Sequence, residues 1–289
     1  MSSSSGYRIV KLTSGAHSVH SLEHGETFHP GVGPVAEAEA LYVRQLELLE
    51  WLRCHTGEFV VWDVGLGAAA NAVTLLRAAR DVPAAIRIVS FDHTLEAIQF
   101  ALEHTGVLEY LVGYEAGLRQ LLRDKHVSFR HGALAVNWTL HLADFPSLIA
   151  QPAAETFPKP HVILFDAFSP AKNPAMWTQP LFANVFKLLD PKRPCVLPTY
   201  SRSTLLRVTL LLAGFFVGIG HPTGEKEETT MASNTLDLIK EPLERRWLQR
   251  ARRSTSAEPM WDAAYRQLPL SKATLQRLEQ HPQFVQGLF

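Results

Sequence analysis

The chain has few cysteines and no excess of charge of one sign, and each shortage excludes a class of protein. Its two cysteines, Cys54 and Cys195, are too few for a disulfide framework and fit a reducing compartment; we expect both to be buried. Lys plus Arg and Asp plus Glu both number 28, so the net charge is zero before the 13 histidines are counted. No overall field therefore attracts a polyanion, and any nucleic-acid site must be a local patch.

Long apolar runs are also missing from the sequence. The stretch over residues 213–219 falls well short of the ~18 residues that a membrane-spanning helix needs. Residues 1–6 are a serine run without the apolar centre of a secretory signal. We therefore expect a cytoplasmic protein with no membrane partner. Apolar residues still make up 46% of the chain, which is enough for a sizeable core.

The middle of the chain alternates short apolar runs with helical stretches. Runs that are apolar on both faces, as in strands buried between two helix layers, occupy residues 59–64, 86–91, 162–165 and 195–199. Helical stretches cover residues 68–80, 95–104, 117–125 and 180–189. This repetition predicts an α/β fold with a mostly parallel, doubly wound sheet. Further strands are expected at residues 127–130 and 134–142, and residues 215–219 with 229–239 could close the sheet as an antiparallel pair.

The two ends of the chain have a different character. Residues 7–12 and 17–22 predict a small hairpin, and the apolar spacing of residues 35–53 predicts one helix after a glycine- and proline-rich loop. Beyond Lys240 the composition changes to long charged side chains with two helix-like pieces. We therefore expect an N-terminal hairpin and loop (residues 1–34), a core (residues 35–239) and a C-terminal helical extension (residues 240–289).

The sharpest local pattern is a strand that ends in an acid and two glycines. A helix of small residues that includes Asn71 starts directly after Asp63, Gly65 and Gly67. Glycines permit positive φ and close backbone approach, and the N-terminus of the following helix favours a negative group. This pattern predicts a nucleotide-like ligand. The alternative is a tight turn that holds no ligand.

Two further acids follow predicted strands. Asp92 comes about 25 residues after the glycine turn, where a carboxylate of an open α/β sheet commonly accepts the hydroxyls of a ribose. Asp144 could accept a hydrogen bond from an adenine amino group, with Leu142 or Phe145 covering the ring. Either acid could instead cap the helix that follows it, the one after Asp92 starting near Thr94.

A fourth acid opens the most unusual segment of the sequence. The strand over residues 162–165 delivers Asp166 to the carboxyl edge of the sheet, where ligands of such folds bind. Beyond it, residues 167–177 contain two prolines together with Lys172, Asn173 and Trp177. This composition predicts a prearranged pocket wall.

The segment from Asp166 to Trp177 resembles the Asp-Gly/Ala-Phe-Ser/Ala-Pro-x-Lys-Asn-Pro-x-Met-Trp signature of the MnmC-like methyltransferases. Gly25-Glu26-Thr27-Phe28-His29 is similar to the entrance loop of that family, and Glu37-Ala38, Tyr42-Val43 and the glycine turn support the resemblance. The resemblance implies a Rossmann-like class I methyltransferase with a seven-stranded sheet whose final strand is antiparallel. It also implies S-adenosyl-L-methionine as the cofactor and, as the acceptor, an aminomethyl group on wobble uridine of tRNA.

The resemblance assigns site residues by their positions in this sequence. The expected cofactor-binding residues are Glu26, Thr27, Asp63, Gly65, Gly67, Asn71, Asp92, Asp144 and Asp166. Asp166 is expected to orient the acceptor amine and to assist loss of its proton, with Phe168 and Trp177 shaping the approach. Lys172, Asn173 and Trp177 are expected to contact the substrate. No metal is expected, because His and acidic residues are scattered.

Other functions stay open at the level of the sequence. Residues 224–228 carry three acids where the characterised family members are basic, which favours a small-molecule amine or hydroxyl as the acceptor. The cluster of Arg245, Arg246, Arg250, Arg252 and Arg253 could replace that basic patch. A nicotinamide-dependent oxidoreductase and a cofactor-binding module without turnover are further alternatives. The flavin-dependent oxidase half found in some family members is not expected here, so a separate FAD-dependent oxidase or another tRNA-modifying enzyme could supply the aminomethyl substrate.

Overall fold

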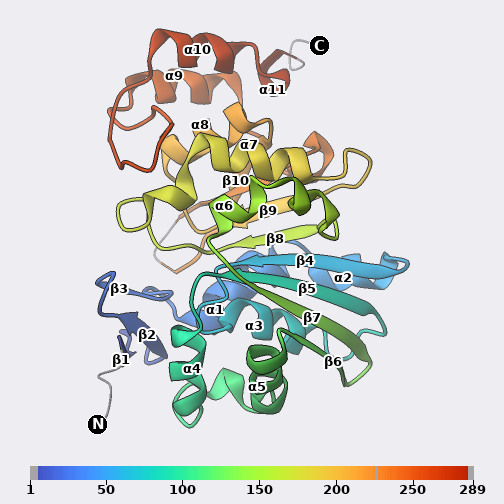
Figure 1. Cartoon of the computed structure of the whole chain (residues 1–289). Coiled ribbons are helices and arrows are strands. Elements are labelled where there is room, and N and C mark those ends of the chain that lie inside the picture. Colours follow the sequence, from blue (N-terminus) through green and yellow to red (C-terminus); the bar gives the residue numbers. More distant parts are fainter. Residues whose placement is uncertain (1–5, 225–226, 286–289) are drawn as a thin grey trace. The chain divides into compact units, whose positions relative to one another are not determined.

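The computed structural model describes residues 6–224 and 227–285, which divide into two compact units (Figure 1). Unit 1 contains the chain up to Phe145 together with residues 163–166 and 221–227. Unit 2 contains residues 146–162 and 167–220 and the chain from Glu228 onward. Each unit is described by itself below.

Unit 1 begins with a small antiparallel sheet. The predicted hairpin is confirmed as β1 (Tyr7–Lys11) and β2 (His17–Ser21), which pair with Ile9 opposite Val19. A short third strand, β3 (Glu26–Thr27), was not predicted and pairs with the end of β2.

The single helix predicted over residues 35–53 is wrong. The segment consists of α1 (Pro34–Ala38), a π-helix η1 (Glu39–Arg44) and α2 (Leu48–Cys54). The wider π turn is closed by the bond from the Gln45 N–H to the carbonyl of Ala40, five residues back. Glu47 then adopts a left-handed conformation with φ 49°, which separates the two helical parts.

The large sheet of unit 1 has the strand order β8-β4-β5-β7-β6. Its strands are β4 (Glu58–Val64), β5 (Ala85–Asp92), β6 (His126–His131), β7 (Leu134–Leu142) and β8 (Val162–Phe165), of which Ile163 onward belongs to unit 1. β4, β5 and β7 are mutually parallel, whereas β6 is antiparallel to β7. The accompanying helices are α3 (Ala70–Ala78), α4 (Glu96–Glu103) and α5 (Glu115–Asp124), of which α5 packs on β6 and β7. Trp62, Phe91 and Trp138 are fully buried in its core.

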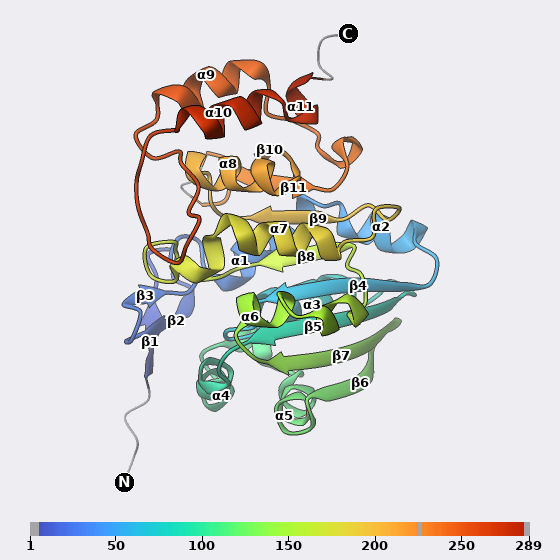
Figure 2. The same cartoon turned by 45° about the horizontal axis from the view of Figure 1, so that its top comes forward.

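Unit 2 has the strand order β10-β11-β9 and several helices (Figure 2). Its strands are β9 (Val196–Thr199), β10 (Phe216–Gly220) and β11 (Thr229–Ser233), and both neighbouring pairs are antiparallel. Its helices are α6 (Phe145–Ile149, Pro146 onward), α7 (Gln179–Leu188), α8 (Thr204–Ala213), α9 (Arg245–Arg253), α10 (Lys272–Glu279) and α11 (Pro282–Val285). α7 packs on α8, and α10 packs on α8 and α9.

Several details differ from the prediction. β6 covers the strand predicted at residues 127–130 and is antiparallel to β7, so an antiparallel pair occurs in unit 1 as well as among the final strands. The second closing strand stops at Ser233, where the chain turns into a 3₁₀ helix (Leu236–Leu238).

Cys195 is buried as expected, but Cys54 is exposed because it ends α2 on the polar side. Residues 225–226 of the predicted acidic hairpin lie outside the described residues. Of the helices in the part of the chain that the structure describes, none is long and apolar enough to cross a membrane.

Candidate active site

The ends of four strands meet at one edge of the unit 1 sheet. Val64 of β4 lies opposite Phe91 of β5, and Asp92 lies opposite Leu142 of β7. The N–H of Asp166 donates to the carbonyl of Val64 at 3.1 Å, so the residue after β8 lies beside the end of β4. The structure therefore brings together the strand ends that carry Gly65, Asp92, Asp144 and Asp166.

The glycine turn is built around positive backbone angles and a carboxylate clamp. Gly65 has φ 90° and Gly67 has φ 50°, conformations that favour glycine. A Cβ at Gly67 would lie 3.2 Å from the ring of Phe28, which covers the turn. The Gly67 N–H donates to Asp92 Oδ2 at 2.9 Å, and the Thr94 N–H donates to Oδ1 at 3.2 Å. Asp92 thus holds the turn and also caps the following segment.

Asp63 lies inside the sheet below this turn. It is 1% exposed, and the Ser90 hydroxyl donates to its Oδ2 at 2.6 Å, while the Trp138 indole N–H donates to the Ser90 hydroxyl at 2.8 Å. Burial raises the pKa of Asp63 to about 7, against the hydrogen bond from Ser90, and the charges of Asp92 and Asp166 add to the increase. A carboxyl in this place supports the turn from the interior.

The remaining predicted cofactor residues of unit 1 are accessible. Asp144 is exposed, next to Phe145, which is buried against the ring of Phe91 at 5.0 Å between centroids. Glu26 and Thr27 are half-buried in β3, where the Thr27 hydroxyl contacts the Nδ1 atom of His20 at 2.8 Å.

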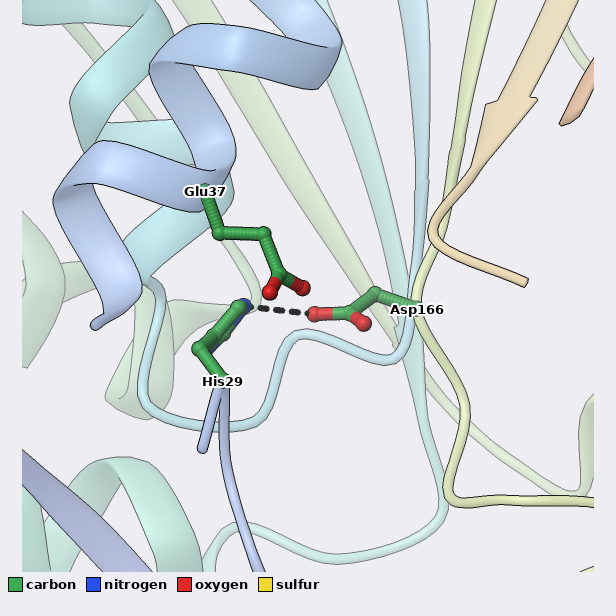
Figure 3. A group of neighbouring side chains, drawn as sticks. All are labelled: His29, Glu37 and Asp166. Carbon is green, nitrogen blue, oxygen red and sulfur yellow. Dashed lines mark ion pairs between the residues drawn. The ribbon is translucent and has the colours of Figure 1, made fainter. Parts of the chain in front are cut away.

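The centre of the site is a cluster of His29, Glu37 and Asp166 (Figure 3), which Asn71 joins through hydrogen bonds. His29 Nε2 lies 2.8 Å from Asp166 Oδ2, and the Asn71 amide donates to the same oxygen at 2.7 Å. The Asn71 Oδ1 lies 3.3 Å from His29 Nε2. The donor atoms of His29, Glu37 and Asp166 all lie within 4.8 Å of one another. One ring nitrogen thus faces two carboxylates and an amide.

Charge and backbone conformation both mark His29 as unusual. Burial alone would lower its pKa, but the charge and hydrogen bond of Asp166, with smaller contributions from Glu37 and Asn71, raise the pKa to about 9. His29 also has φ 49°, a left-handed conformation that is uncommon for a residue with a side chain. Such strained residues concentrate at functional sites, where the surrounding structure holds them in place.

The other predicted residues belong to unit 2. The Trp177 indole N–H donates to the carbonyl of Phe168 at 2.7 Å, and the Trp177 side chain is fully buried. The backbone N–H groups of Lys172 and Asn173 both donate to the carbonyl of Ser169, at 2.9 and 2.8 Å. Lys172 is exposed, and Asn173 and Phe168 are half-buried. These bonds make residues 168–177 a tightly turned loop.

Sequence reasoning missed two members of the central cluster. His29 and Glu37 lie in segments that were compared with the family but received no role. A signal for Glu37 was present, because it lies on the same helical face as Pro34 and Ala38 and is 5% exposed. A carboxylate on a buried helical face requires a polar or charged partner, and the charge of Glu37 acts on the His29 ring.

Comparison with known proteins shows what this chain is similar to. A family model described as S-adenosyl-L-methionine-dependent methyltransferase matches residues 117–235. Two curated relatives, from Ectopseudomonas mendocina and Cupriavidus metallidurans, are named tRNA 5-methylaminomethyl-2-thiouridine biosynthesis bifunctional protein MnmC. They are 26% and 25% identical over 70% and 74% of this chain. The chain spans about a third of the length of these relatives, 32% in both cases.

Solved structures agree on the fold. The structure of MnmC2 from Aquifex aeolicus has a TM-score of 0.68 and 23% identity, and the match covers 96% of this chain and 86% of that one. A spermidine synthase in complex with the transition-state analogue AdoDATO has a TM-score of 0.50 and 12% identity, covering 95% and 85% of the two chains.

Over residues 117–235 the chain is similar to S-adenosyl-L-methionine-dependent methyltransferases, and its fold agrees with that of the MnmC2 structure. The curated relatives are of the MnmC type, which agrees with the resemblance of the segment from Asp166 to Trp177 to that family.

Proposed function

We propose that this chain transfers a methyl group to the aminomethyl nitrogen on wobble uridine of tRNA. The observation that carries the proposal is the Asp166 carboxylate, which two donors hold at one oxygen beside the end of β4. Methyl transfer to an amine is an in-line displacement, so alignment contributes most of the catalysis. A fixed carboxylate at this edge of the sheet can accept an N–H of the amine, orient its lone pair and assist loss of the proton.

The residues of unit 1 fit the cofactor. Gly65 and Gly67 with positive φ shape a tight turn at this edge of the sheet, and Asp92 and Asp144 are acceptors at neighbouring strand ends. We assign Glu26, Thr27 and these four residues to binding S-adenosyl-L-methionine. When bound, the cofactor supplies an electrophilic methyl group. Asp63 and Asn71 support the site from below, through Ser90 and Asp166 respectively.

The loop after Asp166 belongs to the same proposal. Lys172 and Asn173 would contact the acceptor, and Phe168 would shape its approach. Because Trp177 is fully buried and bonded to the Phe168 carbonyl, we assign it the task of fixing this loop rather than stacking on the substrate. A cytoplasmic location and a separate oxidase that supplies the aminomethyl group would follow from a tRNA substrate.

One acid of the segment over residues 224–228, whose charge disfavours RNA binding, has a structural role. Glu228 accepts a bond from the buried Arg207 at 3.1 Å, so this acid stabilises the fold of unit 2. The exposed arginines of α9 could contact phosphates. Arg246 and Arg252 pair with Glu244 and Glu279, and these pairs can exchange for phosphate.

The direct test is methyl transfer followed by nucleoside mass spectrometry. The substrate is tRNA whose wobble uridine carries an unmethylated aminomethyl group, purified from cells that lack the methylating enzyme. This tRNA is incubated with the purified chain and S-adenosyl-L-methionine. The proposal predicts conversion of the aminomethyl nucleoside into its methylaminomethyl form, with tRNA affinity that falls steeply as salt rises. Charge reversal of Arg250 and Arg253 should weaken tRNA binding without reducing cofactor affinity. Cofactor binding with no conversion of any tRNA would contradict the proposal.

A small-molecule amine is the second candidate for the acceptor. The zero net charge of the chain favours it. The same assay with a mixture of small amines distinguishes the two, because turnover of a small amine would be insensitive to salt over the range that releases tRNA.

A further inference from the structure

We propose that His29 is a positioning residue for methyl transfer: its ring, between the carboxylates of Asp166 and Glu37, acts as a fixed cation that keeps Asp166 ionised and oriented. The inference rests on the proposed role of Asp166, but its first test below needs no substrate. Neither the family model nor the names of the relatives assign a role to His29.

The contacts fix both the position and the direction of the carboxylate. His29 Nε2 and the Asn71 amide converge on one oxygen of Asp166, at 2.8 and 2.7 Å. Two donors on a single oxygen define the plane of the carboxylate, because a rotation would break both bonds at once. Figure 3 shows the ring of His29 directed toward Asp166, with the carboxylate of Glu37 beside the pair.

The charges of the cluster require a cation. One ring nitrogen of His29 and one carboxylate oxygen each of Glu37 and Asp166 lie within 4.8 Å of one another, and Glu37 is 5% exposed. Two carboxylates this close repel each other, so one of them would take up a proton unless a positive charge lies between them. An imidazolium supplies that charge, and the pKa of about 9 for His29 agrees with a charged ring at neutral pH. The charge of Asp166 also raises the pKa of the buried Asp63, so Asp63 is a further titratable group coupled to this cluster.

Four separate segments build the cluster. His29 comes from the loop after β3, Glu37 from α1, Asn71 from α3 and Asp166 from the residue after β8. The loop holds His29 at φ 49°, an unfavourable conformation for a residue with a side chain. The Nδ1 atom of His29 is buried and has no hydrogen-bond partner among the described residues, so the ring is held from its Nε2 side. A histidine with a purely structural role would require neither the unfavourable backbone conformation nor the buried Nδ1 atom without a hydrogen bond.

The first test is an NMR titration of the His29 ring in the protein without cofactor or substrate. The signal is assigned by its loss in His29→Gln. We expect the ring to stay protonated through about pH 8, and we expect its midpoint to fall by about one pH unit or more in Asp166→Asn and in Glu37→Gln. His281, a buried histidine of unit 2, provides the internal control and should titrate unchanged. A neutral His29 ring at pH 7 would overturn the proposal. So would a titration midpoint that stays at the wild-type value in both variants.

The second test is the pH profile of the methyl-transfer rate in His29→Gln. Glutamine can still donate a hydrogen bond but carries no charge. We expect kcat to fall about 10- to 100-fold with little change in cofactor affinity, and the acid limb of the profile to move to higher pH. His281→Gln, the matched substitution of a buried histidine, should leave the shape of the profile unchanged. A rate reduced equally at every pH would show a merely structural role.

Metal analysis completes the test, because the same three residues offer metal-ligand atoms. We expect no stoichiometric metal in the purified protein and no loss of activity after treatment with a chelator. A bound divalent ion that is lost in Asp166→Asn would overturn the assignment of a protonated ring.

Discussion

The two units of this protein bury charged side chains in opposite ways. In unit 2 the Arg207 guanidinium, 2% exposed, pairs with Glu228 at 3.1 Å and also donates to the Thr230 hydroxyl and the Thr229 carbonyl. In unit 1 the single ring of His29 faces two carboxylates. One cluster is balanced in charge, while the other has an excess of negative charge.

The difference separates a structural charge from a functional one. Arg207 extends from a regular helix to a strand, and its partners satisfy all three of its donor nitrogens. His29 has a positive φ and an unpartnered ring nitrogen, and it lies beside a glycine turn at the carboxyl edge of a parallel sheet. A satisfied buried pair stabilises the fold, whereas an uneven cluster at that edge is suited to bind a cationic group.

The largest effect should come from Asp166→Asn. The amide keeps the shape of the side chain but cannot assist loss of a proton, so we expect the methyl-transfer rate to fall about 10²- to 10⁴-fold while cofactor still binds. Rates are measured under saturating substrate. Glu228→Gln, the corresponding change in the balanced cluster, should leave the rate per folded molecule unchanged. Equal rates in Asp166→Asn and wild type would remove the distinction between the two clusters.

Arg207→Met should have the opposite effect: the free energy of unfolding should decrease, while the methyl-transfer rate per folded molecule should stay the same. Removing one partner of a buried ion pair typically costs about 3–5 kcal/mol, and we expect the lower end because Glu228 remains partly exposed and can hydrate. Urea unfolding gives the free energy of unfolding. A loss below about 1 kcal/mol would mean that the pair is not structural.

Stability should also depend on pH through His29. Its pKa is raised from 6.5 to about 9 in the folded chain, so folding is favoured by its proton below pH 6.5, and this contribution is lost as the pH rises through 9. Each pKa unit corresponds to about 1.4 kcal/mol, so the contribution is up to about 3 kcal/mol. The melting temperature of the wild-type chain should therefore decrease as the pH rises from 6.5 to 9. The slope should be shallower in His29→Gln, and an identical slope would refute the assignment.

The smallest effect is expected at the glycine turn. Alanine at Gly67 would be strained at φ 50°, and its Cβ would press on the ring of Phe28. We expect about a 10-fold loss of cofactor affinity, or about 1.4 kcal/mol, by calorimetry. Gly57, which also has a positive φ but has open space around it, provides the matched control for backbone strain alone. If Gly57→Ala caused the same loss of cofactor affinity, the effect at Gly67 would be due to backbone strain alone, and the turn would have no specific role in binding the cofactor.

Periodicity predicted the sheet well because buried strands differ sharply in composition from the helices between them. β7 was predicted with its observed bounds, and the strand ends at Gly65, Asp92 and Asp166 do meet at one edge. The π turn in residues 39–44 could not be predicted, because its apolar spacing differs from that of an α-helix by only one residue. The exposure of Cys54 depends on which side of α2 faces solvent, and composition does not reveal that.

The site was predicted in part for a similar reason. Acids that follow strands are visible in a sequence, since the end of a parallel strand defines where its side chain lies. His29 lies in a loop 137 residues before Asp166, and only the folded loop, with its left-handed residue, brings the two within 2.8 Å. The burial of Trp177 was not predicted either, because its bond to the Phe168 carbonyl depends on how the proline-rich loop turns.

Calorimetric titration with S-adenosyl-L-methionine, and in parallel with a nicotinamide dinucleotide, tests the central claim most directly. The account predicts that wild type binds the methyl donor and not the dinucleotide, and that Asp92→Asn weakens this binding about 10-fold or more. Binding of the dinucleotide alone, or no binding of the methyl donor to the folded wild-type chain, would contradict it.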